Sequence, residues 1–88
     1  MKELKDTVEN MVSENYVNRF IAEYEQVKIR AEKLKSFCTK IELAEVYHIG
    51  IAPEHDCPLN ILREQLRAMD NYISMLEKRA VIEGISLE

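Results

Sequence analysis

The fold of this chain depends on two stretches, residues 17–41 (VNRFIAEYEQVKIRAEKLKSFCTKI) and residues 59–80 (LNILREQLRAMDNYISMLEKRA). In both, apolar residues recur in alternating steps of three and four, the a/d pattern of packed helices. The apolar positions are Val17, Phe20, Tyr24, Val27, Ala31, Leu34, Cys38 and Ile41 in the first stretch and Leu59, Leu62, Leu66, Met69, Ile73, Leu76 and Ala80 in the second. The pattern predicts an all-α protein, an antiparallel two-helix hairpin.

Residues that start and stop helices set the expected boundaries of a single domain, 1–88. Asn15, with Ser13 as a rival, is expected to cap the first long helix, Pro58 to occupy the first position of the second, and Gly84 to end it. Helical spacing upstream predicts a further short helix. We therefore expect a short N-terminal helix at 1–14, helices at 15–43 and 58–83, and a loop at 44–57.

The second helix carries another apolar stripe beside its first. Its members are Ile61, Ala68, Tyr72, Met75 and Ile82. One partner helix covers only one stripe, and burial of each large apolar side chain is worth about 1.5–3 kcal/mol. We therefore expect an oligomeric helical bundle, a homo-oligomer of two or four hairpins with this helix at its centre. The alternative is a monomer in which the N-terminal segment covers the stripe.

Composition excludes several classes of protein. The 88 residues include 12 basic and 16 acidic side chains, a net charge of −4, so a general binder of DNA or RNA is not expected. Neither a run of about 20 apolar residues nor the apolar core of a signal peptide is present, which indicates no membrane partner and a cytoplasmic location. In that compartment Cys38 and Cys57 are expected to be free thiols.

Residues for catalysis or metal binding are not in the required patterns. The serines have no histidine or flanking glycines at local spacing, as a nucleophile would need. Cys38, His48, His55 and Cys57 lack the short pairs of a zinc site, and the glutamates lack a Glu-x-x-His pair. We expect no enzyme activity, no catalytic residue, no metal and no cofactor.

Antiparallel pairing of Ile41 with Pro58 would place Arg19 opposite the region of Arg79. By the same register, Lys33 would face Gln65. This arrangement forms one cationic cluster at each end of the hairpin.

Two tyrosines lie near these arginines. Tyr16 is one helical turn from Arg19, and Tyr72 is two turns from Arg79. A ring that stacks on a base beside a guanidinium that binds phosphate suits a nucleotide. The competing interpretation is that these residues form the rim of an oligomer interface.

The polar residues of the pattern carry a family resemblance. The matching string is Asn15-Tyr16-x-x-Arg19, Glu23, Glu32-Lys33-Leu34-x-x-Phe37 and Leu62-x-x-Gln65-Leu66-x-x-Met69-x-x-Tyr72-x-x-x-Leu76-x-x-Arg79. It resembles a family of small helical phage proteins, found also in crAss-like phages, that includes anti-CBASS sponges. The resemblance spans Asn15 to about Ile82. The chain differs from the family pattern in a longer loop that holds Cys57, Pro58 and two histidines.

The resemblance implies a phage protein of immune evasion in the host cell cytoplasm. Such a sponge would sequester a cyclic dinucleotide, such as cyclic GMP-AMP, between protomers without cleaving it. The implied ligand-binding residues are Tyr16, Arg19, Tyr72 and Arg79 as one wall, with Lys33 and Gln65 as further contributors.

Two other functions remain open on the sequence. The first is a helical protein–protein interaction module that inhibits or adapts a host protein. The second is a small helical enzyme with the architecture of chorismate mutases, which is disfavoured because the arginine pattern of their first helix is not matched.

Overall fold

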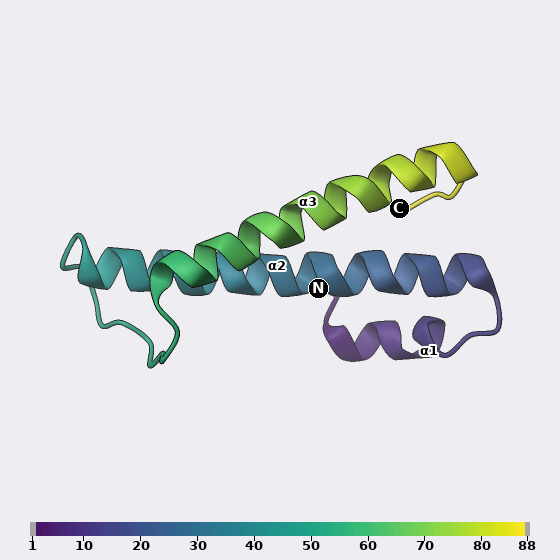
Figure 1. Cartoon of the computed structure of the whole chain (residues 1–88). Coiled ribbons are helices and arrows are strands. Elements are labelled where there is room, and N and C mark those ends of the chain that lie inside the picture. Colours follow the sequence, from purple (N-terminus) through teal and green to yellow (C-terminus); the bar gives the residue numbers. More distant parts are fainter. Residues whose placement is uncertain (1, 88) are drawn as a thin grey trace.

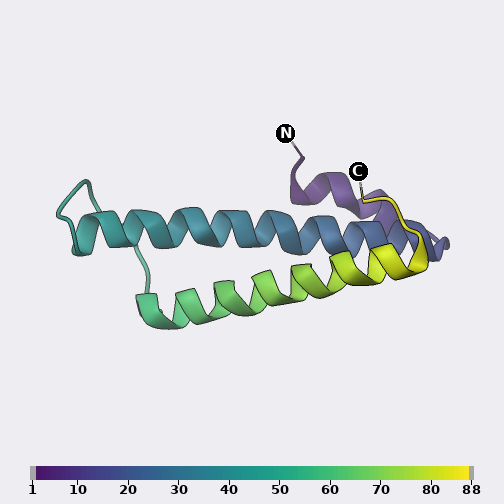
Figure 2. The ribbon, with the colours of Figure 1, turned by 90° about the horizontal axis from the view of Figure 1, so that it is seen from above.

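The computed structural model describes residues 2–87. All regular secondary structure in this part of the chain is helical, as expected. It contains a 3₁₀ turn, η1 (Leu4–Thr7), a one-turn helix, α1 (Val8–Met11), and two long helices, α2 (Tyr16–Glu45) and α3 (Leu59–Glu83). Figures 1 and 2 show α3 lying along α2 and running in the opposite direction. The molecule is elongated, with extents of 47 × 24 × 21 Å.

Local caps explain where the long helices begin and end. Asn15 caps α2, because its side chain accepts a hydrogen bond from the Asn18 amide at 3.2 Å. Gly84 ends α3 in the left-handed conformation, with φ 70°. Both caps were expected from the sequence. His48, with φ 58°, takes the left-handed position after α2, and the Ile49 amide donates to the Leu43 carbonyl at 2.8 Å.

The start of α3 differs from the expectation for Pro58. This residue is the N-cap and not the first helical residue, because its ψ of 148° is extended. Its carbonyl accepts hydrogen bonds from the amides of Ile61 and Leu62 at 3.1 and 3.2 Å. The end of α2 also differs, since the helix continues two residues beyond the expected limit at Leu43.

The core lies between α2 and α3, near the end of the helix pair that is opposite the connecting loop. We call this end, where α2 begins and α3 ends, the open end. Its cluster of buried residues consists of Phe20, Tyr24, Val27, Leu76 and Ala80, with Met69, Ile73, Ile85 and Leu87 packed against it. All of these except Ile85 and Leu87 belong to the two apolar patterns. The tail after α3 therefore adds two core side chains that the helical pattern does not include.

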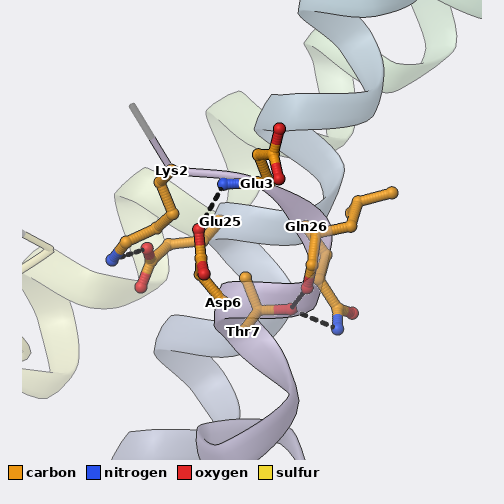
Figure 3. A network of polar contacts seen from close by, with 7 residues as sticks. Lys2, Glu3, Asp6, Thr7, Glu25 and Gln26 are labelled. Carbon is orange, nitrogen blue, oxygen red and sulfur yellow. Dashed lines mark hydrogen bonds and ion pairs between the residues drawn. The ribbon is translucent and has the colours of Figure 1, made fainter.

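Among the described residues before α2, the elements η1 and α1 pack on α2, and their backbones do not lie against α3. We call residues 4–12 the arm. Figure 3 shows how this segment is held on α2: Thr7 of the arm is buried and accepts a hydrogen bond from Gln26 of α2 at 2.9 Å, and Lys2, which precedes the arm, forms an ion pair with Glu25. The alternative in which this segment covers the second stripe of α3 is therefore wrong for the described residues.

Leu76→Ala tests the core. Because Leu76 is 1% exposed, the truncation leaves a cavity, and we expect the free energy of unfolding to fall by about 2–5 kcal/mol. Chemical denaturation followed by circular dichroism measures the change. Val81→Ala is the matched control, since Val81 is 83% exposed, and its effect should stay within about 0.5 kcal/mol. Equal effects would contradict the packing described.

Candidate functional site

A groove opens on one side of the α2–α3 pair, between both helices and the arm. Its volume is about 400 Å³, within the range of small-molecule sites. It is lined by Leu4, Arg30, Lys33, Leu34, Phe37, Gln65 and Met69. The groove thus holds two of the residues expected at a ligand site, Lys33 and Gln65.

Helical spacing explains why these side chains meet. Arg30, Lys33 and Phe37 follow one another in steps of three and four, so they share one face of α2. Leu34 and Met69, from the apolar patterns of the two helices, supply apolar lining, and Leu4 of the arm supplies one edge. In the described part of the chain neither Arg30 nor Lys33 forms an ion pair, so both cations are available to an anionic ligand.

The aromatic ring of the groove is held by the loop between α2 and α3. The His55 ring lies edge-on to the Phe37 ring, with centroids 6.3 Å apart and planes at 85°. His55 Nδ1 lies 2.9 Å from the Cys57 carbonyl oxygen, and its Nε2 lies 3.6 Å from a Glu45 carboxylate oxygen. The His55 ring, itself held by the loop, thus packs against the half-buried Phe37 ring that lines the groove.

A second cluster lies at the open end of the helix pair. The Arg79 guanidinium donates to the Tyr16 hydroxyl at 2.8 Å and to Glu83 at 3.3 Å, and the Tyr16 hydroxyl donates to Glu83 at 2.8 Å. Arg79 also lies 4.9 Å from the centroid of the Phe20 ring. In this chain the charge of Arg79 is therefore balanced by Glu83.

Two tyrosines of the helix pair have shifted pKa values. The hydrogen bond to Glu83 raises the pKa of Tyr16, because ionisation would place two negative charges together. Burial, followed by the 2.8 Å hydrogen bond to Glu77, raises the pKa of Tyr24. Both phenols consequently stay neutral donors at physiological pH.

The structure brings some of the expected ligand-binding residues together and separates others. Tyr16 bonds to Arg79 and Glu83, whereas the expected register placed Arg19 opposite Arg79; in the structure the neighbouring residue, Phe20, faces Arg79. Arg19 points elsewhere and donates to the Ser13 carbonyl at 2.9 Å. Tyr72 is 42% exposed on α3.

The six residues expected to bind the ligand therefore lie at different places in one chain. Lys33 and Gln65 line the groove, whereas Tyr16 and Arg79 lie at the open end. Gln65, Tyr72 and Arg79 are each seven residues apart, so they share one face of α3 that runs from the groove toward the open end.

Sequence reasoning missed Arg30, Phe37 and His55 as candidate site residues. The signal for Arg30 and Phe37 was present, because they lie at helical spacing from Lys33. Nothing local indicates His55, since its contact with Phe37 depends on the path of the loop. Both cysteines are free thiols, as expected, and within residues 2–87 no group of three metal-binding side chains gathers.

A comparison with protein families identifies the family of this chain. The model of the Sequestin family matches residues 14–82, which include α2, the loop after it and α3 up to Ile82. The chain belongs to the Sequestin family. The residues of the groove and of the open-end cluster lie in this Sequestin region, except Leu4 of the groove and Glu83 of the cluster. No curated protein and no solved structure matches the chain.

Glu83→Gln tests the open-end cluster. Without the carboxylate, the pKa of Tyr16 should fall toward its ordinary value of about 10. Because the folded-state pKa is raised, the stability that this bond contributes is complete below about pH 10 and is lost as the pH rises through the folded value. Alkaline titration by ultraviolet absorbance measures the shift, with Tyr16→Phe identifying the signal. Glu64→Gln should leave the titration unchanged, and an unshifted Tyr16 in Glu83→Gln would contradict the cluster.

Proposed function

We propose that this chain is a phage anti-defence sponge that binds and sequesters a cyclic dinucleotide immune signal, such as cyclic GMP-AMP of CBASS, in the host cell cytoplasm. The observation that carries the proposal is the groove, where Arg30 and Lys33, which form no ion pair within residues 2–87, lie beside the Phe37 ring. Membership in a family named Sequestin supports the sequestering of a ligand.

The chemistry of the groove suits such a ligand. A cyclic dinucleotide presents two phosphodiester charges and two flat bases. Arg30 and Lys33 supply the opposite charge, Phe37 supplies a stacking surface, and the Gln65 amide supplies donors and an acceptor for a base edge. Since the lining contains no hydroxyl, thiol, imidazole or carboxylate to activate water or attack a phosphodiester, we propose binding without cleavage.

We further propose a homo-oligomer, a dimer or a tetramer, because the second stripe of α3 is exposed. Ile61, Tyr72, Met75 and Ile82 are 47%, 42%, 50% and 83% exposed. If protomers pair through their α3 helices, Tyr72 and Arg79 of one protomer would lie toward the ligand site of its partner. Tyr16 and Arg19 would then take part in ligand binding, as the family resemblance implies.

An interaction module is the second candidate, and one observation favours it. The turn after α2 presents four apolar side chains to solvent: Val46, Tyr47, Ile49 and Ile51 are 58%, 60%, 61% and 95% exposed. Exposed apolar clusters of this kind mark contacts with other proteins. Capture of a host protein, together with the absence of any small-molecule binding, would favour this function.

Isothermal titration calorimetry against a panel of cyclic dinucleotides tests the sponge. We expect saturable binding, followed by recovery of the intact ligand after denaturation of the protein, because the groove offers charge and stacking but no reactive group. Chromatography of the released ligand measures its integrity. Absence of heat with every member of the panel would contradict the sponge, and a cleaved ligand would show an enzyme.

Arg30→Ala and Lys33→Ala test the groove itself. Hydrogen bonds to charged groups are worth about 1.5–3 kcal/mol, so each variant should weaken the affinity about tenfold or more. Lys35→Ala is the control, since Lys35 lies on α2 outside the groove lining. If instead Arg19→Ala and Arg79→Ala abolish binding while the groove variants do not, the ligand binds at the open end.

A further inference from the structure

One face of α2 carries both the polar groups that hold the segment before it and the cations of the groove. The residues of this face follow one another in helical steps, which places them on one side of the helix. They are Arg19, Gln26, Arg30, Lys33 and Phe37. The last three line the groove, whereas the first two do not.

The segment before α2 engages the first two residues of this face. Arg19 donates to the Ser13 carbonyl at 2.9 Å, and the Gln26 amide donates to the Thr7 hydroxyl at 2.9 Å. Figures 1 and 2 show the arm, in purple, beside the first half of α2. The arm thus covers the earlier part of the face and leaves the later part, with Arg30 and Lys33, open to a ligand.

Leu4 lies where the covered part meets the groove. It is half-buried, and it is the residue that the arm contributes to the groove lining. The Thr7 hydroxyl donates to the Leu4 carbonyl at 2.7 Å while it accepts from Gln26, and Thr7 is only 2% exposed. Figure 3 shows the contact of Thr7 with Gln26. This buried hydroxyl therefore links the backbone of Leu4 to α2.

The residues before Leu4 are held as well. The Glu3 amide donates to the Asp6 carboxylate at 2.8 Å, which closes the first turn of η1. Lys2 forms an ion pair with Glu25 of α2. Leu4 thus lies between two attachments to α2, one through Lys2 and one through Thr7.

The arm side of the groove differs in chemistry from the rest of its lining. The Leu4 side chain is apolar and carries neither a charge nor a hydrogen-bond donor. A phosphate pressed against it would lose hydration without gaining a side-chain partner, whereas a phosphate beside Arg30 or Lys33 gains a charged donor. The groove therefore favours a ligand whose charges all lie along α2.

We propose that Leu4 is a specificity-determining residue, which makes the groove favour a cyclic dinucleotide over a linear dinucleotide that ends in a free phosphate. The inference rests on the proposed sponge function. A cyclic dinucleotide has two phosphodiesters and no terminal phosphate, so its charges can lie beside Arg30 and Lys33. The linear form of the same bases is longer and carries a terminal phosphate that the Leu4 side chain cannot bind. Leu4 lies outside the residues that the Sequestin model matches, so we assign this selection to this chain and not to the family.

Calorimetric titration of the full chain with cyclic GMP-AMP and with the linear, 5′-phosphorylated dinucleotide of the same bases tests the selection. The wild-type chain should bind the cyclic form about tenfold or more tightly than the linear form. Leu4→Lys places a cation on the arm side, so it should raise the affinity for the linear form and reduce this ratio about tenfold. Circular dichroism should show unchanged helix content.

Val12→Lys is the matched control for the added charge. Val12 belongs to the arm, is 71% exposed and does not line the groove, so the ratio of the two affinities should stay as in the wild type. Equal binding of the two nucleotides by the wild-type chain would overturn the proposal. So would the same change of the ratio in Leu4→Lys and Val12→Lys.

Methyl NMR of the full chain without a nucleotide tests the place of Leu4 separately. The Leu4 methyl groups should show nuclear Overhauser contacts with other side chains of the groove lining, and Gln26→Ala should weaken these contacts because Thr7 loses its bond to α2. Contacts that are absent, or that Gln26→Ala leaves unchanged, would overturn the role of Leu4. If the contacts are present but the wild-type chain binds neither nucleotide, the sponge is contradicted and the selection fails with it, while the packing of the arm stands.

Discussion

Burial of Phe20, Tyr24 and Val27 of α2 against Leu76 and Ala80 of α3 is the contact on which the other features depend. It sets the register of the two helices and therefore which polar side chains face each other across them. Tyr24 reaches Glu77, Arg79 lies over Phe20, and Tyr16 reaches Glu83 as consequences of that register. The tail closes the same core, because Ile85 and Leu87 pack against it after Gly84 turns the chain.

The same register places the groove on the loop side of this core, and Met69 both packs against the core and lines the groove. There the helices contribute Arg30 and Lys33 from α2 and Gln65 from α3, and the arm adds Leu4. The two ends of the helix pair thus differ in electrostatics. At the open end Glu83 balances the charge of Arg79, whereas in the groove the cations have no acidic partner among the described residues. A free cation loses less on binding a phosphate than one that must first leave a carboxylate.

The chain also leaves much apolar surface exposed for its size. Two long helices and a short arm cannot bury every apolar side chain that their sequences carry, because a small domain has a high ratio of surface to volume. Most of the exposed large apolar residues gather in three places: on the arm at Val8, Met11 and Val12, on the second stripe of α3, and in the turn after α2. Grouping of this kind is typical of surfaces that meet a partner. In the described residues no helix is long and apolar enough to cross a membrane.

The sequence by itself determined the two long helices, the caps at Asn15 and Gly84, and the apolar seam. These features follow from local chemistry and from the helical period, which act on neighbouring residues. Only the tertiary structure decided that the arm packs on α2, that His55 contacts Phe37, and that Tyr16 rather than Arg19 bonds to Arg79. Each of these contacts joins segments that are far apart in the chain. Their geometry is set by side-chain packing and by the path of the loop, and the local periodicity of the sequence encodes neither the packing nor the path.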